Sequence, residues 1–188
     1  KKGIKAIKKY IKEEEYNKAL KAIKKILKAE DEEDETKEKA WVLAGISYER
    51  MGENETAKTA YKKAIEINKD AIEAYKGIID IEEKEGTQKI ETIEHIINYI
   101  RLIKERVKKE EEHLAKKEID KRIENIVVII KNTKEDLNID DIKTYRHVLE
   151  EYKVEEMVMC LTKMYLKKLL NREGEKQYNI VEEVEKEK

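Results

Sequence analysis

Residues 38–70 read EKAWVLAGISYERMGENETAKTAYKKAIEINKD, and the fold prediction starts from their pattern. Apolar or small residues recur there at the i, i+3, i+4, i+7 spacing of a single helical face, first at Trp41, Ala44, Gly45 and Tyr48, then at Ala57, Ala60, Tyr61 and Ala64. Gly52 can adopt the left-handed conformation that ends a helix, and Asn54 is suited to cap the next one. The small residues let two backbones approach closely. The stretch therefore predicts two antiparallel helices packed face to face.

The same residues stand at the spacing of the tetratricopeptide repeat signature, which belongs to a helix pair about 34 residues long. Residues 38–71 resemble that repeat, although Ala44 replaces its leucine, Tyr61 its phenylalanine and Lys69 its closing proline. The alternative interpretation is an ordinary amphipathic helical hairpin. The resemblance implies an all-α protein, built as a right-handed stack of antiparallel helical hairpins, that is, a TPR-like α-solenoid.

The resemblance weakens on both sides of this central copy. Downstream, Tyr75 lies 34 residues after Trp41; upstream, Tyr10 lies 38 residues before Tyr48, which indicates a lengthened loop between the copies. We therefore expect three repeat-like helix pairs in residues 1–101.

Beyond residue 101 the signature fades. Residues 104–118 are strong helix formers, so they either extend the preceding helix or contain a tight turn. Degenerate helical hairpins packed on the array are expected over residues 102–174, with a loop at residues 132–138. Residues 175–188 are expected to form a charged C-terminal capping helix, because the last repeat of a solenoid otherwise exposes its stacking surface.

The composition excludes several classes of protein. Charged residues make up 45% of the chain, against about 25% in an average domain, and proline and phenylalanine are absent. Hydrophobic residues still reach 39%, enough for a core. The longest apolar runs have five residues, against about 20 for a membrane span, so no transmembrane segment is expected. We therefore expect a cytoplasmic location. Lysine, glutamate and isoleucine abound, which is typical of proteins from thermophiles. Because the sequence begins at Lys1, we also expect it to be a piece of a longer protein.

Residues capable of catalysis or metal binding are few and scattered. His95, His113 and His147 are too far apart to form a local zinc motif, and paired cysteines and a Gly-rich phosphate loop are absent from the sequence. Glu110 and His113 form a single Glu-x-x-His step, whereas di-iron bundles use two. Cys160 is expected to be a buried hydrophobe. We expect no enzyme activity, no catalytic residue, no metal and no cofactor.

The resemblance also implies a binding site. In repeats of this family the first helices of successive pairs line a concave groove that holds a partner's peptide or helix. The positions that match this groove are Ile4, Lys8, Ile11, Lys39, Val42, Leu43, Ile46, Arg50, Lys76, Asp80 and Lys84. The resemblance thus implies a protein–protein interaction scaffold.

The residues of this groove indicate the chemistry of the partner. Val42, Leu43 and Ile46 predict an aliphatic centre rimmed by charge, which favours an apolar or amphipathic segment of another protein. Leu43 stands where family members that clamp chaperone tails have asparagine, so a chaperone C-terminal tail is not expected. The alternative is that another part of the same chain, such as residues 175–188, covers these aliphatic residues and makes the groove a core. Self-association of the stack also stays open.

A second functional hypothesis starts from the distribution of charge. Residues 1–29 hold eleven lysines and three glutamates, a net charge of +8, and residues 30–38 carry −6. A basic surface of this kind is typical of proteins that bind nucleic acid or anionic membranes. The alternative is a solvated face whose field the acidic loop offsets. Arginine, the preferred phosphate reader, is absent from residues 1–29, so nucleic acid is the less favoured partner.

Overall fold

The structure is a computed structural model that describes residues 2–133 and 137–187. All regular secondary structure within these ranges is helical, which confirms the prediction of an all-α helical-repeat fold. The helices are α1 (Lys2–Lys12), α2 (Tyr16–Lys28), α3 (Asp34–Arg50), α4 (Asn54–Ile67), α5 (Ile72–Glu85), α6 (Ile90–Arg106), η1 (Lys109–Glu111), α7 (Glu112–Thr133), α8 (Ile139–Glu151) and α9 (Glu155–Lys186). The chain divides into two compact units, Lys1–Arg122 and Ile123–Lys188, so that α7 begins in one and ends in the other.

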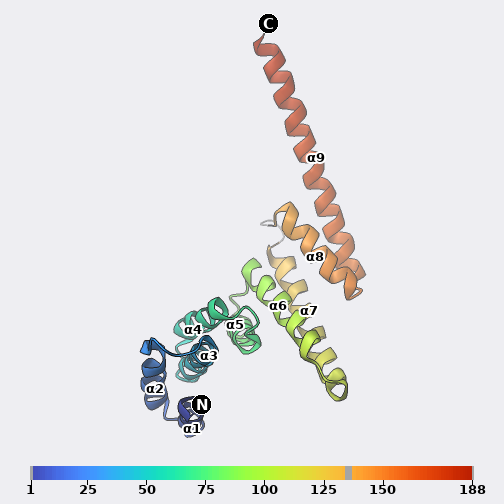
Figure 1. The fold of residues 1–188 in the computed structure, drawn as a ribbon. Helices are drawn as coiled ribbons and strands as arrows, with labels where there is room; N and C mark the ends of the chain where they lie inside the picture. Colours follow the sequence, from blue (N-terminus) through green and yellow to red (C-terminus); the bar gives the residue numbers. More distant parts are fainter. Residues whose placement is uncertain (1, 134–136, 188) are drawn as a thin grey trace. The chain divides into compact units, whose positions relative to one another are not determined.

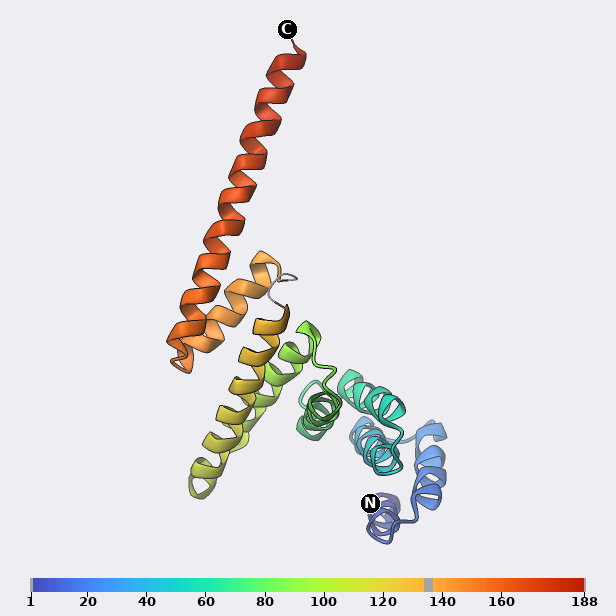
Figure 2. The ribbon, with the colours of Figure 1, turned by 180° about the vertical axis from the view of Figure 1, so that it is seen from behind.

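The N-terminal unit holds three consecutive helix pairs, α1/α2, α3/α4 and α5/α6. Each helix packs on the next along the chain, and the first helices of successive pairs also touch, since α3 contacts both α1 and α5. Figures 1 and 2 show these helices following one another from α1 to α6. Hairpins that contact their sequence neighbours in this way are the defining feature of a helical repeat.

Two hydrophobic clusters within the described residues join helices α1 to α5, and α3 belongs to both. The first cluster joins α1, α2 and α3 through the buried side chains of Ile4, Ile7, Ile11, Ala19, Ile23, Ala40, Leu43 and Ala44, with Ala60 of α4. The second joins α3, α4 and α5 through Val42, Ala57, Tyr61, Ala64, Ala71, Ala74, Ile78 and Ile81. The Tyr61 ring fills the space beside two helical glycines: a Cβ atom at Gly45 of α3 or at Gly77 of α5 would lie within 3.0 Å of that ring.

The turns between helices agree in part with the sequence. Gly52 (φ 80°) and Gly86 (φ 68°) adopt the left-handed conformation and end α3 and α5. The expected cap at Asn54 is wrong, because Glu53 is the N-cap residue and the Asn54 amide donates to Glu85 Oε1 at 2.7 Å.

Residues 104–118 contain a tight turn and do not extend helix α6. Helix α6 ends at Arg106, because Val107 takes an extended conformation (φ −65°, ψ 132°), and α7 begins at Glu112. Helix α7 runs through Thr133, into the predicted loop of residues 132–138, of which residues 134–136 lie outside the described ranges.

The C-terminal unit packs α8 against α9 through a small core that includes Leu149, Met157 and Leu161. A separate helix over residues 175–188 was predicted, but this segment, as far as Lys186, is the last part of the 32-residue helix α9. Gly174 lies within a helix there because residues on both sides are good helix formers. The capping role, and the packing of residues 102–174 on the array, stay predictions.

Candidate functional site

The predicted groove residues lie on α1, α3 and α5, the three adjacent first helices. Five basic residues among them are exposed: Lys8, Lys39, Arg50, Lys76 and Lys84. Ile46 and Asp80 are half-buried. Among the predicted positions, the side chains exposed to solvent are therefore basic, with one partly accessible aliphatic side chain on α3.

The other four predicted groove residues are core residues, which corrects the expected aliphatic centre. Ile4 and Ile11 are buried in α1, and Val42 and Leu43 keep only 4% and 7% of their exposure. The reason is that α3 has a neighbouring helix on each side: Leu43 packs in the cluster with α1, and Val42 in the cluster with α5. These four residues are therefore covered by the same chain, with α1 and α5 as the elements that cover the two on α3.

Two of the exposed lysines are already engaged within their own helices. Lys39 Nζ lies 2.9 Å from Glu35 Oε1, and Lys76 Nζ lies 2.7 Å from Asp80 Oδ2. Burial works to raise the pKa of Asp80, but its hydrogen bonds with Lys76 and Arg122 outweigh this effect and hold the pKa below its ordinary value of 3.8. Asp80 is therefore a carboxylate at neutral pH, and its charge is offset from two sides.

Arg122 organises a charge cluster that the sequence analysis missed. Its side chain is only 1% exposed, and its guanidinium binds Asp80 Oδ1 (2.5 Å), Glu83 Oε2 (3.2 Å) and Glu118 Oε1 (2.9 Å). The guanidinium also lies 5.6 Å from the centre of the Tyr99 ring, whose hydroxyl donates to Glu118 at 3.1 Å. The cluster thereby ties α5 and α6 to the first part of α7 within the N-terminal unit.

One signal could have revealed this cluster. Arg122 immediately precedes Ile123 inside an isoleucine stripe, a position where a charged side chain needs a buried partner. The sequence does not say which helix supplies the partners, so Asp80 was assigned to the groove alone. The structure shows that Asp80 serves the packing of α5 on α7.

The three histidines and the single cysteine differ in how far they are buried. His95 is half-buried with its ring 6.0 Å from that of Tyr75, and burial lowers its pKa. His113 and His147 are exposed, and Cys160, expected to be buried, is half-buried. Within residues 2–133 and 137–187, no group of three or more His, Cys, Asp or Glu side chains is arranged so that it could hold a metal ion. None of the helices described there combines the length and the apolar character that crossing a membrane requires.

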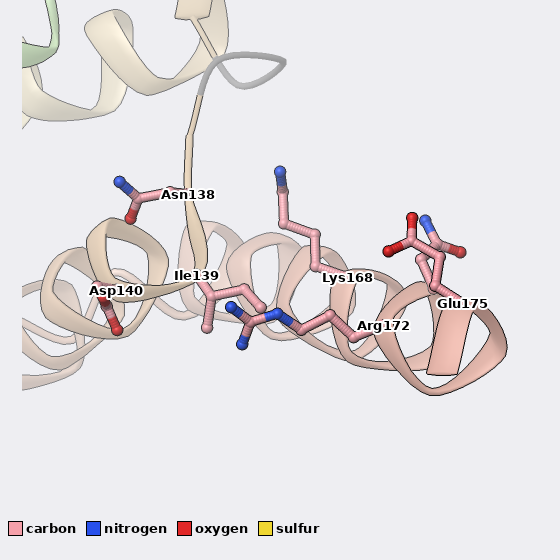
Figure 3. Close-up of a pocket in the computed structure, with 7 residues that line it drawn as sticks. Asn138, Ile139, Asp140, Lys168, Arg172 and Glu175 are labelled. Atoms are coloured by element: carbon pink, nitrogen blue, oxygen red, sulfur yellow. The ribbon is translucent and has the colours of Figure 1, made fainter. Parts of the chain in front are cut away.

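Cavities lined by described residues occur in both units. The first, of about 350 Å³, lies in the N-terminal unit and is mainly apolar, with Ile72, Tyr99, Ile103, Val107, Leu114 and Ala115 among its lining residues. The second, of about 430 Å³, lies in the C-terminal unit and is lined by Asn138, Ile139, Asp140, Lys168, Asn171, Arg172 and Glu175. In Figure 3 the Arg172 side chain extends along α9 toward Ile139. Because the second cavity mixes acidic and basic groups and contains no thiol or imidazole, it does not define a reaction.

The helix pairs and the buried tyrosine between small residues define a class, the α-helical repeat proteins. The tetratricopeptide repeat family model matches residues 38–71, the segment of the central pair α3/α4, which confirms the resemblance over that segment. No curated protein matches the chain. Tetratricopeptide repeats typically serve as scaffolds for protein–protein interaction and are generally non-catalytic.

Proposed function

We propose that the chain is a non-catalytic scaffold that binds a segment of another protein along α1, α3 and α5. The observation that carries the proposal is the exposure of five basic side chains on three adjacent helices, on which four of the five predicted aliphatic groove residues are buried. A groove of this composition favours an amphipathic segment with acidic residues and one apolar side chain for the half-buried Ile46. Charge complementarity would set the specificity and the association rate more than the affinity.

Selection from a displayed peptide library, followed by fluorescence anisotropy on one enriched peptide, tests this function. The decisive variant is Lys8→Glu/Arg50→Glu on the groove helices. Its matched control is Lys24→Glu/Lys62→Glu, which changes the net charge equally on α2 and α4, the second helices of their pairs, where both lysines are exposed.

We expect acidic amphipathic peptides to be enriched, and the groove variant to bind at least about tenfold more weakly than the control, a difference of about 1.4 kcal/mol. Equal losses in the two variants would indicate attraction by overall charge and would overturn a groove on α1, α3 and α5.

A second candidate function is binding to nucleic acid or anionic membranes through residues 1–29. The observation in its favour is that the ten described lysines of this segment are all exposed, while Ile4, Ile7 and Ile11 are buried. Titration of duplex DNA and of phosphatidylserine vesicles at several salt concentrations tests it. This function requires binding that falls steeply with salt, in proportion to the number of phosphate contacts.

A further inference from the structure

From Leu166 onward, α9 presents an apolar stripe that its own unit does not cover. Figures 1 and 2 show α8 alongside only the first part of α9. Leu161 is fully buried there, whereas Leu166 (52% exposed), Leu170 (72%), Val181 (55%) and Val184 (50%) are accessible. Leu166 and Val184 are eighteen residues apart, which is about five helical turns, so both lie on the same face.

The order of residues along this stripe is nearly symmetric about Glu175. Reversing the helix about that position brings Leu166 level with Val184 and Leu170 beside Val181. Glu173 and Gln177 also exchange places, and a glutamine amide can donate to a carboxylate. Two copies of the helix that run in opposite directions would therefore match aliphatic with aliphatic layers and pair a polar layer at the centre.

The charges follow the same reversal. Residues 163–172 carry Lys163, Lys167, Lys168 and Arg172 without an acidic residue, a charge of +4, and residues 173–187 carry −4. Lys167 and Glu185 lie on the same flank of the stripe, since eighteen residues again separate them. In an antiparallel pair of helices, Lys167 of one copy lies next to Glu185 of the other copy. A parallel pair instead places the two basic segments together and the two acidic segments together.

We propose that α9 is a self-association element, and that two copies of this chain pair antiparallel through Leu166, Leu170, Val181 and Val184. Gly174, whose Cβ position has open space around it, lies beside the centre of this contact. The proposal is independent of the groove, because it uses only residues of the C-terminal unit.

Sedimentation velocity of the full chain over two orders of magnitude in concentration tests the proposal. We expect a reversible monomer–dimer equilibrium whose dissociation constant rises by about tenfold or more in Val181→Glu/Val184→Glu. Asn179→Glu/Lys186→Gln is the matched control, because it changes the charge by the same amount at two exposed sites on the opposite face of α9. A wild-type chain that stays monomeric throughout, or an equal effect of the control, overturns the proposal.

The orientation is tested by cross-linking in a Cys160→Ser background. We expect a disulfide to form when Leu166→Cys and Val184→Cys proteins are mixed, and little cross-linking of either protein alone. Efficient cross-linking of the Leu166→Cys protein with itself would indicate a parallel pair and overturn the antiparallel arrangement. Circular dichroism on each variant verifies that the helices are retained.

Discussion

Tyr61 shows at the residue scale how the central repeat is held together. Its ring lies against Gly45 of α3 and Gly77 of α5, and its hydroxyl donates to Glu49 Oε1 at 2.9 Å. Burial, with the nearby charge of Glu49, raises the pKa of Tyr61, so the hydroxyl stays protonated at physiological pH. Tyr61 of α4 thus fixes how closely α3 and α5 approach α4. This explains why the repeat needs the small residues at these contacts as much as it needs the aromatic residue.

Replacing either glycine with alanine should therefore destabilise the chain. Alanine favours a helix over glycine by about 1 kcal/mol, but at Gly45 or Gly77 the new Cβ would overlap the Tyr61 ring, and overpacking costs about 1–3 kcal/mol. Urea unfolding measures the net loss for Gly45→Ala and Gly77→Ala. Gly174→Ala is the control and should be neutral or stabilising, since nothing lies within 4 Å of its Cβ position. A stabilised Gly45→Ala chain would contradict the close contact.

Burial of Val42 leads to a second prediction at the same scale. Val42→Glu places a carboxylate among the apolar side chains of the second cluster, where an unpaired charge costs about 3–5 kcal/mol. Ile46→Glu should cost much less, because Ile46 is only half-buried. Thermal unfolding of the two variants decides between a core and an open groove at this position. If Val42→Glu melted at the wild-type temperature, Val42 would be a surface residue and the predicted aliphatic centre would stand.

At the scale of elements, the Arg122 cluster makes the packing of α5 and α7 sensitive to acid. The pKa of Asp80 in the folded chain lies below its ordinary value of 3.8, so the folded state binds this proton less readily than the unfolded state. The stabilising effect is therefore complete above about pH 4 and is lost as the pH falls through the folded-state pKa. Asp80→Asn should be less stable than wild type near pH 6, and the difference should shrink on acidification.

Urea unfolding at a series of pH values checks this expectation, with Asp31→Asn as a control at an exposed position. A difference between wild type and Asp80→Asn that grew as the pH fell would mean that the pKa of Asp80 is raised rather than lowered. In that case the salt bridges with Arg122 and Lys76 would not determine its charge.

The elements that the sequence predicted best are those in which local pattern and packing agree. Residues 38–71 combine a helical period with small residues at the contacts, so the pattern specifies both the helices and how closely they pack. The turn after Arg106 was not decided by the sequence, because residues 104–118 are mostly strong helix formers and contain neither glycine nor proline. The sequence also did not predict that α9 continues through Gly174. One glycine destabilises a helix by about 1 kcal/mol, and the strong helix formers on both sides of Gly174 override this cost.

The sequence predicted which helices carry the candidate site, but not which of its residues are exposed. Spacing shows that Lys39, Val42, Leu43 and Ile46 share a broad face of α3, but it does not show that α1 and α5 cover the two flanks of that face. Burial of a residue depends on which helices are adjacent, and this information is absent from the helix itself. Arg122 is a second example, because its partners on α5 lie about forty residues earlier in the chain.

At the scale of the whole molecule, the division into two compact units predicts that they unfold with different stabilities. Leu161 is fully buried between α8 and α9, and its replacement by alanine should destabilise the C-terminal unit by about 2–5 kcal/mol. The single tryptophan, Trp41, lies in α3 of the N-terminal unit, so its fluorescence follows that unit alone, whereas far-UV circular dichroism follows the helices of both.

In Leu161→Ala the circular dichroism transition should therefore begin at lower urea concentration, while the Trp41 transition stays where it is in wild type. Non-coincident transitions are the standard sign that unfolding is not two-state, and nearest-neighbour coupling in helical repeats makes this behaviour physically reasonable. If both probes shifted together by the same amount, α7 would couple the two units into one cooperative structure. Destabilising changes in α9 would then weaken the α1, α3 and α5 surface as well.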